Sequence, residues 1–515
     1  MSSEVSNPAV RDQWGTKLGF LLAAIGSAIG LGNIWRYPYV VYENGGGAFL
    51  IPYFVALATA GLPILMLEYS LGHRYRQGAP ATFHFVSRRW EALGWWQAAI
   101  SFVIATYYVV IIAWCLSFIY YSLGQDSGDD TGAFFIGDYL ATSDGAAPSG
   151  FWDIGGLQWK VVLPLAIAWL LIGFLMHRGV SRGIEMASRV LMPTLVVMLI
   201  IIVIRAVTLD GAEVGLDVLF TPDFGRLGDA SVWVAAYGQV FFSLSIAFSI
   251  MIAYSSYLPK RTDLSNSALI VGLSNAGFEL LAAIGVFGAL GFLAQASGVP
   301  VTEVAQSGVV LAFIVFPQVI SALPALNSVF GVIFFGTLFF AGITSMVSIL
   351  ETVVASVREK FDLGRTAAVN WICGLATLIS LLYVTRGGLF YLDTIDHFVN
   401  AYGLVVAGLL QVVLIAWIAR TLTDQQRHIN AISFVQVGTW WTVSLKYVTP
   451  LLLGFMIMYG AVEELRKNYE DYPSSGLLFV GVGAVLVTLA FSLALSLNGR
   501  LPHDDIVHQP DLVKE

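Results

Sequence analysis

Charged side chains are scarce in this 515-residue chain: they make up 12% of its residues, about half the share found in soluble globular proteins. Hydrophobic residues make up 57%. Because so few charges cannot cover the surface of a water-soluble protein of this length, most of the chain must face a non-aqueous environment. We therefore expect one polytopic membrane domain over residues 1–498, followed by a polar cytoplasmic tail over residues 499–515.

Cysteine is almost absent as well. Cys115 and Cys373 both lie in apolar stretches, which argues against a disulfide framework and against a cysteine-based metal site. The chain contains no P-loop, zinc-protease, nucleophile-elbow or CxxC motif, so we expect it not to be an enzyme. The net charge of −8 and the lack of a basic run argue against nucleic acid as a partner.

Apolar runs long enough to cross a membrane recur along the chain. A helical span needs about 20 mostly apolar residues, and the runs are continuous rather than alternating, which favours helices over strands. Twelve transmembrane helices are predicted, at residues 18–42, 48–71, 95–121, 161–176, 190–207, 232–257, 264–293, 327–357, 367–383, 398–418, 446–462 and 476–497. An even number of spans places both termini on the same side of the membrane.

The distribution of basic residues predicts which side that is. The segments HRYRQ and SRRW follow the second span, HRGVSRG follows the fourth, PKRTD the sixth and VREKFDLGR the eighth. Residues 125–158, between spans three and four, instead hold six aspartates and neither lysine nor arginine. By the positive-inside rule, we expect a plasma-membrane protein with both termini in the cytoplasm and the acidic loop outside.

The first span contains residues that suit the centre of a membrane helix poorly. GSAIGLGNIWRYPYV, residues 26–40, holds three glycines, an asparagine, an arginine and a proline. Glycine leaves helical geometry readily, and unwinding frees backbone groups that are costly against lipid. Freed carbonyls can hold a hard cation and freed amides can hold a carboxylate. Close helix packing would explain a single glycine, but three glycines followed by Asn33 favour a binding site.

The sixth span has a matching interruption. FFSLSIAFS, residues 241–249, is rich in serine within an otherwise apolar run. Spans one and six are the first members of two successive sets of five spans, and interrupted helices at matching positions of two halves indicate a transporter's central site. We therefore expect two inverted repeats, at about residues 14–207 and 231–420, followed by spans eleven and twelve at about residues 444–498.

These interruptions stand in recognisable motifs. GSAIGLGNIWRYPYVVYENGGGAFLIPY, the pair Tyr107 and Tyr108, GQVFFSLSIAF, SNAGFE, FFAGITS and LDTID together resemble the neurotransmitter:sodium symporter family, in particular its bacterial amino-acid transporters. The resemblance covers nearly the whole chain. It implies sodium-coupled symport of a neutral, hydrophobic amino acid into the cell by alternating access. Ser27, Ser243 and Ala247 depart from relatives that carry asparagine, threonine and glycine at these positions.

The resemblance also implies two Na⁺ ions as cofactors. The first would be held, together with the substrate's carboxylate, by the backbone or side chains of Ala28, Asn33, Ser243 and Asn275. The second would be held by the carbonyls of Gly26, Ile29 and Ala341 and the hydroxyls of Thr344 and Ser345. All are neutral oxygen donors, which suit Na⁺ better than a transition metal.

The resemblance to the family also predicts which residues form the substrate site. It would be formed by Ala28, Gly30, Gly32, Ile104, Tyr108, Phe242, Ser243, Ser245, Phe248, Ser345 and Ile349. Monoamine carriers of the family place an aspartate at the position of Gly30, so the glycine here leaves room for a substrate carboxylate. Ile104 and Ile349 would close the side-chain end of the pocket.

Two buried glutamates draw attention because ionisable residues inside spans are functional candidates. Glu279 occupies a position where chloride-dependent relatives have serine, so its carboxylate would replace the anion and make transport chloride-independent. Glu68 has two open interpretations, a role in transport and a structural hydrogen-bond partner.

Gates at both ends are implied as well. Arg36 and Asp396 match the outer pair, with Tyr108 and Phe248 as a thin lid below it. Arg11 and Glu359 match the inner pair, supported by Trp14 and Tyr257. The expected partners are a small neutral amino acid and membrane lipid, for a monomer or weak dimer. Alternatives that remain open are a sodium-dependent amino-acid sensor or leak channel on this fold, and a carrier of another carboxylated solute such as a betaine-like compound.

Overall fold

The computed structural model describes residues 12–124, 128, 130–142 and 151–498, and helices make up most of these ranges. Within them, the only extended pairing is a single bridge between Leu157 and Thr385. The prediction of an all-helical chain is confirmed. Arg11, several aspartates of the acidic loop and the tail at 499–515 lie outside the described residues.

Ten helical segments of the described chain are long and apolar enough to cross a membrane. They are Gly46–Tyr75, Arg88–Gly124, Trp159–His177, Val180–Val207, Leu264–Ser297, Asn327–Phe361, Arg365–Val384, Gly388–Ile418, Thr439–Asp471 and Ser474–Leu497. An eleventh candidate is a bent pair, in which α1 (Lys17–Ala28) is followed at an angle of 53° by the helical segment Gly32–Glu43, made of α2 (Gly32–Trp35) and α3 (Tyr37–Glu43).

The remaining predicted span, at 232–257, is divided into two shorter helices. α11 (Ala230–Ser243) and α12 (Ile250–Ser256) are separated by residues 244–249. We call residues 29–31, between α1 and α2, the first break, and residues 244–249 the second break. Both predicted interruptions are therefore present as gaps in helical structure.

Several boundaries differ from those predicted. α19 begins at Gly388 rather than at residue 398, so the LDTID motif is helical. The helix starts early because residues 388–398 carry an apolar stripe with buried Tyr391, Leu392 and Ile395, which a hydropathy window diluted by Asp393 and Asp396 misses.

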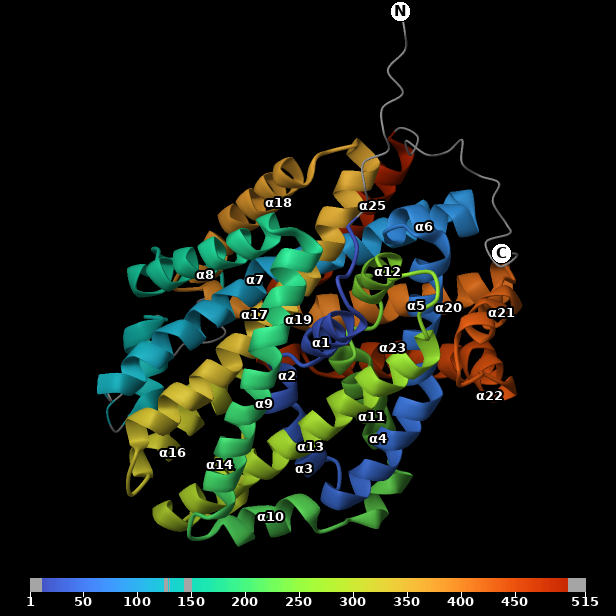
Figure 1. The fold of residues 1–515 in the computed structure, drawn as a ribbon. Helices are drawn as coiled ribbons and strands as arrows, with labels where there is room; N and C mark the ends of the chain where they lie inside the picture. Colours follow the sequence, from blue (N-terminus) through green and yellow to red (C-terminus); the bar gives the residue numbers. More distant parts are fainter. Residues whose placement is uncertain (1–11, 125–127, 129, 143–150, 499–515) are drawn as a thin grey trace, which may run out of the picture.

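The connecting segments also contain helices that the apolar runs do not predict. These short helices are α6 (Ala79–Val86), α10 (Ala212–Phe220), α16 (Phe316–Ala322) and α21 (Leu422–Ile432). α6 and α10 lie at opposite ends of the molecule (Figure 1). We refer below to the α6 end and the α10 end.

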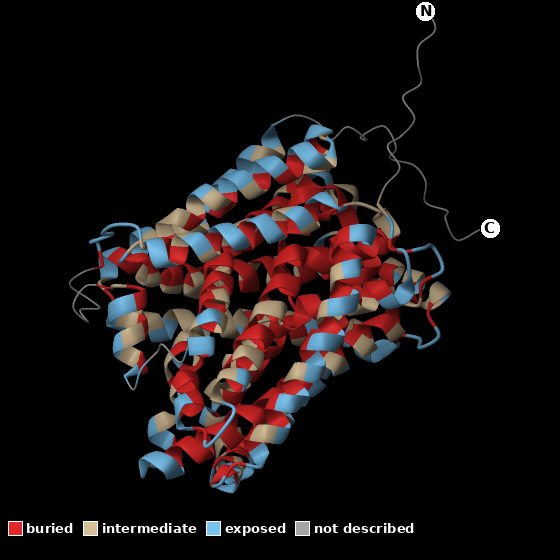
Figure 2. Ribbon diagram, turned by 60° about the vertical axis from the view of Figure 1, so that its left-hand side comes forward, coloured by how far each residue is buried: buried red, intermediate tan, exposed pale blue. Residues whose placement is uncertain are grey.

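The two breaks lie near the middle of the helix bundle. α1 is surrounded by other helices and contacts α9 (Met186–Val207), α13 (Leu264–Ser297) and α17 (Asn327–Phe361) (Figure 1). Buried residues concentrate along the inner helices, whereas exposed residues lie on the outer faces of the peripheral ones (Figure 2). The breaks are therefore shielded from the surface on which lipid would lie.

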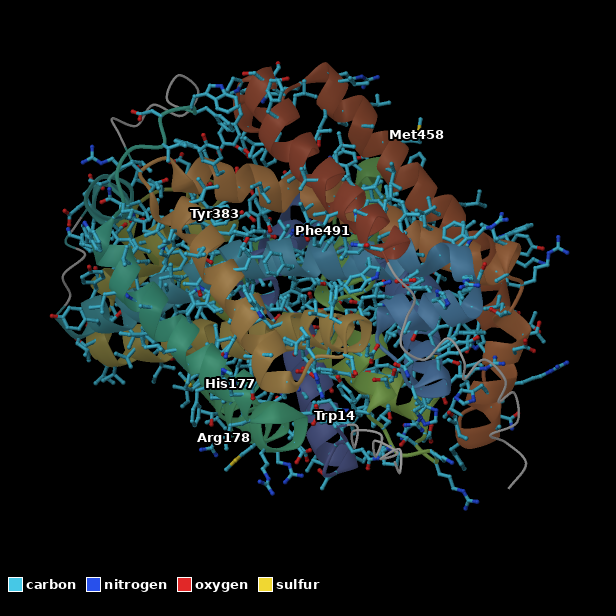
Figure 3. All side chains as sticks on the ribbon, turned by 90° about the horizontal axis from the view of Figure 1, so that it is seen from above. Trp14, His177, Arg178, Tyr383, Met458 and Phe491 are labelled. Atoms are coloured by element: carbon cyan, nitrogen blue, oxygen red, sulfur yellow. The ribbon has the colours of Figure 1, made fainter. Side chains whose placement is uncertain are left out.

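The peripheral helices show what that surface is made of. α23 (Thr449–Arg466) and α25 (Gly483–Leu497) run along one edge of the bundle, where Met458 and Phe491 are labelled (Figure 3). These two side chains are 65% and 57% exposed. Large apolar side chains exposed along a whole helix are expected against hydrocarbon rather than water.

Candidate functional site

The first break leaves backbone oxygens without partners. α1 ends at Ala28, and Ile29 is extended (φ −78°, ψ 95°). Among the described residues, no amide or side chain donates a hydrogen bond to the carbonyls of Gly26, Ala28 or Ile29. The carbonyl between them, on Ser27, instead accepts from the hydroxyls of Ser245 (3.0 Å) and Ser345 (3.4 Å). The three unpaired carbonyls are those predicted to bind cations.

The side chains predicted for the first sodium site lie together. Asn33 Nδ2 donates to Asn275 Oδ1 (2.8 Å), and Asn275 Nδ2 donates to Ser243 Oγ (3.0 Å). Asn33 Oδ1 accepts from the amide of Gly30 (2.9 Å), which folds the side chain back over the break. All three side chains are less than 5% exposed. The structure thus brings α2, α11 and α13 together at one buried, uncharged cluster of oxygen and nitrogen atoms.

The residues predicted for the second sodium site meet where α1 crosses α17. Thr344 Oγ1 donates to the carbonyl of Ala341 (3.0 Å), and a Cβ added to Gly26 would lie 3.1 Å from Thr344 Cβ. Ser345, on the next position of α17, reaches the carbonyl of Ser27. The glycine at 26 therefore allows α1 to pack closely against both Met192 of α9 and the hydroxyl-bearing face of α17.

Gly30 faces the polar end of the predicted substrate site. A Cβ added there would lie 3.1 Å from the hydroxyl oxygen of Tyr108 and 3.6 Å from Ser345 Oγ. The Tyr108 hydroxyl accepts from the amide of Leu31 (3.3 Å). A side chain at Gly30 would crowd these hydroxyls, so the glycine keeps space beside them.

An aromatic group covers this space on the other side. A Cβ added to Gly32 would lie 3.1 Å from Phe242, and the rings of Phe242 and Phe248 meet edge to face at 6.4 Å. The remaining predicted wall residues, Ile104 on α7 (Glu91–Gly124) and Ile349 on α17, are each less than 5% exposed. The two helices that carry these isoleucines, α7 and α17, pack extensively against each other.

The second break has a different backbone. Ser245, Ala247 and Ser249 all have positive φ, at 53°, 65° and 58°. The amide of Ala247 donates to Glu68 Oε1 (2.9 Å) from α5 (Leu62–Tyr75), and the carbonyl of Phe248 accepts from the Ser101 hydroxyl (2.8 Å). Of the two interpretations of Glu68, the structural one is thus observed directly: its carboxylate holds the unwound backbone.

Glu279 lies next to the first sodium cluster. It is fully buried and accepts hydrogen bonds from the hydroxyl of Tyr53, from Gln239 Nε2 (2.7 Å) and from Ser243. Three donors directed at one carboxyl group satisfy its oxygens within the buried site. Because Ser243 contacts both Glu279 and Asn275, a negative charge on Glu279 would stand directly beside a cation in that cluster.

The predicted outer gate pair is not formed in this structure. Arg36 and Asp396, both described, share no ion pair within 4 Å; Arg36 is exposed and its guanidinium lies 5.2 Å from the ring centre of Phe242. Asp396 accepts instead from the hydroxyl of Tyr107 (2.5 Å) and from Asn400 Nδ2 (2.8 Å). The structure thus does not bring together the two residues that were expected to form the outer gate.

The predicted inner gate residues lie at the α6 end. Glu359 accepts from the amide of Gly78 through both carboxylate oxygens (3.0 and 2.8 Å), while its expected partner Arg11 lies outside the described residues. Trp14 is 5% exposed and its indole donates to the carbonyl of Tyr254 (2.8 Å). The hydroxyl of Tyr257 donates to Glu351 (3.0 Å).

An ion-pair network that the sequence interpretation missed joins these residues. Asp12 accepts from Arg358 (2.9 Å) and Arg365 (3.1 Å), and Arg365 also pairs with the buried Glu351 (2.6 Å). The available signal was Glu351 itself, an acidic residue inside the apolar run of span eight. The network ties the segment before α1 to α17 and α18 (Arg365–Ser380).

A histidine pair adds a neutral contact at the same end. His73 Nδ1 lies 2.9 Å from His428 Nε2 on α21, and His73 Nε2 lies 2.9 Å from the carbonyl of Pro259. Burial, helped by His73 and by the nearby Arg74 and Arg76, lowers the pKa of His428 to about 3. His428 therefore stays neutral near pH 7, and its contact does not depend on a charge.

Two interrupted helices that lie against each other in the interior, with unpaired backbone oxygens at one of them, define a helical membrane protein of the secondary-transporter class. The sequence profile of the Sodium:neurotransmitter symporter family matches residues 11–128 and 125–498. The chain belongs to this family, as the motifs predicted. Its members are sodium-coupled transporters rather than enzymes.

Individual relatives agree. An uncharacterised sodium-dependent transporter of Methanocaldococcus jannaschii is 40% identical over 95% of this chain and 97% of its own length. The mouse sodium- and chloride-dependent neutral and basic amino acid transporter B(0+) is 31% identical over 90% of this chain and 81% of its own. The dog sodium- and chloride-dependent taurine transporter is 29% identical over 95% and 83%.

Proposed function

We propose that the protein couples entry of Na⁺ to uptake of a neutral, hydrophobic amino acid by alternating access. The observation that carries the proposal is the first break: the carbonyls of Gly26, Ala28 and Ile29 are unpaired beside Asn33, Asn275 and the hydroxyls of α17. Such uncharged oxygen sets suit Na⁺. Two ions are proposed, one bound at the Asn33–Asn275–Ser243 cluster and one between α1 and α17.

The substrate class follows from Gly30. Because the space beside the Tyr108 and Ser345 hydroxyls is free of an acidic side chain, a substrate carboxylate can lie there and complete the first ion shell. Two of the relatives are an amino acid transporter and a taurine transporter, which supports a small zwitterionic substrate. The buried side chains of Ile104, Phe248 and Ile349 favour an apolar side chain on it.

Chloride independence is part of the proposal. Two of the relatives are named as chloride-dependent, but here the carboxylate of Glu279 is fully buried and hydrogen-bonded to Ser243. A fixed negative charge beside the cation cluster supplies what a bound chloride would supply. We further propose that the two breaks belong to inverted five-helix repeats within twelve spans and that the α6 end faces the cytoplasm.

Uptake into proteoliposomes tests this function. We expect labelled neutral amino acids to accumulate only with an inward Na⁺ gradient, and to accumulate equally when gluconate replaces chloride. Competition by a panel of amino acids, taurine and a betaine identifies the preferred substrate. Saturable sodium-dependent binding without accumulation would instead support a sensor, and downhill flux without coupling would support a leak channel.

A further inference from the structure

The helix that supports the second break from behind is α20 (Val405–Val413), which belongs to the same membrane segment as Asp396. Two of its residues, Gly408 and Gln411, are directed toward the break. They are three positions apart and therefore lie on the same face of the helix. We call this pair the α20 seat.

Gly408 provides the space for the break. A Cβ added there would lie 2.4 Å from Phe241 Cζ and 3.3 Å from Ala247 Cβ. The first distance is far below any contact that real Cβ atoms make, so no larger residue fits beside the Phe241 ring as it stands. The second distance shows that the methyl group of Ala247 is directed at α20.

Gln411 provides the hydrogen bonds. Its Nε2 donates to Glu68 Oε1 (3.0 Å), the same oxygen that accepts the amide of Ala247 (2.9 Å). Its Oε1 accepts from Gln97 Nε2 on α7 (2.7 Å). The side chains of Gln97, Gln411 and Glu68 and the whole of Ala247 are fully buried. A continuous chain of hydrogen bonds therefore runs from α7 through α20 and α5 to the backbone of the second break.

Such support is needed because the second break contains no glycine. A non-glycine residue at positive φ persists only where its surroundings over-determine it. At Ala247 those surroundings are the carboxylate of Glu68 on one side and the α20 seat on the other. The break has alanine rather than glycine at position 247, and Gly408 on α20 leaves room for the methyl group of that alanine.

We propose that Gly408 and Gln411 are positioning residues that fix the geometry of the second break, and with it the position of Ser245 and Phe248 in the binding site. The proposal rests on the proposed function insofar as it assigns those two residues to a substrate site. Because α20 continues through residues 399–404 into α19, the same membrane segment would set both the break and the position of Asp396 at the α10 end.

A glycine pair on this segment gives a matched test. Gly408→Ala introduces the overlap with Phe241, whereas Gly403→Ala introduces only ordinary contacts, at 3.4 Å or more, to Ile100 and Val485. The full-length protein in detergent would be studied by binding of labelled leucine at saturating Na⁺ and by hydrogen–deuterium exchange of residues 244–250. We expect Gly408→Ala to weaken binding roughly tenfold and to accelerate exchange, and Gly403→Ala to match the wild type.

Two further variants keep the test informative if Gly408→Ala does not fold. Phe241→Leu in the Gly408→Ala background removes the ring edge and should restore slow exchange at the break. Gln411→Leu should accelerate exchange of the Ala247 amide and leave exchange of α13 unchanged, even if Gly408→Ala yields no folded protein. The proposal is overturned if Gly408→Ala behaves like Gly403→Ala in exchange, or if Gln411→Leu leaves the Ala247 amide protected. If the wild type binds no amino acid, the proposed function fails, while the exchange comparison still decides the role of the seat.

Discussion

The two breaks interrupt membrane helices in opposite ways. At the first, Gly26, Gly30 and Gly32 allow close approach, and the carbonyls of Gly26, Ala28 and Ile29 remain unpaired. At the second, there is no glycine between residues 244 and 249, three residues have positive φ, and protein side chains bind the amide of Ala247 and the carbonyl of Phe248. The comparison indicates different roles: unpaired carbonyls of the first break are available to ligands, whereas side chains of α5 and α7 hold the strained backbone of the second break at Ala247 and Phe248.

This difference in roles has an energetic basis. A non-glycine residue held at positive φ costs on the order of 1–3 kcal/mol, and a buried unpaired backbone group costs about 1–3 kcal/mol. At span six, the hydrogen bonds from the Ala247 amide to Glu68 and from the Ser101 hydroxyl to the Phe248 carbonyl offset the second term for these two groups. At span one no donor in the described chain reaches the carbonyls of Gly26, Ala28 and Ile29, so ligand binding should contribute strongly to the stability of that region.

Removing the carboxylate that holds the second break should have the largest effect. Glu68→Ala leaves the Ala247 amide and the Gln411 amide group without an acceptor, which we expect to cost about 3 kcal/mol of folding stability. The loss should be the same with and without Na⁺, because the protein itself supplies this support. Thermal unfolding in detergent measures it. Glu68→Gln retains an acceptor oxygen and serves as the control; equal losses for both variants would contradict this role of the carboxylate.

Removing side chains proposed to bind the first Na⁺ should instead change the sodium dependence of substrate binding. We expect Asn275→Ala and Ser243→Ala each to raise the Na⁺ concentration for half-maximal substrate binding about tenfold, because each deletes an oxygen from the cluster that joins α11 and α13. Titration of labelled-substrate binding with Na⁺ measures the shift. Stability in sodium-free buffer should change little. An unaltered sodium dependence in both variants would refute the assignment of the first ion site.

Replacing Glu279, the charged residue beside the first sodium cluster, should change the anion requirement of uptake. With Glu279→Ser, we expect uptake in gluconate to fall by roughly tenfold because the cation loses its fixed counter-charge, and chloride to restore it through the new hydroxyl. Glu279→Ala also removes the charge but offers no hydroxyl to chloride, and its uptake should stay equally low in both anions. If uptake by Glu279→Ser is the same in chloride and in gluconate, Glu279 does not replace an anion.

The same contrast explains what sequence could predict. GSAIGLGN and FFSLSIAFS locate both breaks, because glycine and serine interrupt apolar runs visibly. The supports of the second break could not be predicted, since Glu68, Ser101 and Gln411 are far apart in the chain and only packing brings them to residues 244–249. The short connecting helices and the Asp12–Arg358–Arg365–Glu351 network were missed for the same reason.

The smallest expected effect concerns Ala247, where related transporters carry glycine. Its methyl group is directed at Gly408 rather than at the space beside Tyr108, so Ala247→Gly should leave substrate affinity and selectivity unchanged. Relief of the positive φ favours glycine, while the added freedom of the unfolded chain opposes it by about 0.4–1 kcal/mol. We therefore expect a change in the unfolding midpoint of only a few degrees. A competition panel against labelled substrate provides the decisive measurement: a new preference for larger amino acids would mean that the methyl group limits the pocket, and that the second break contributes to selectivity as well as to architecture.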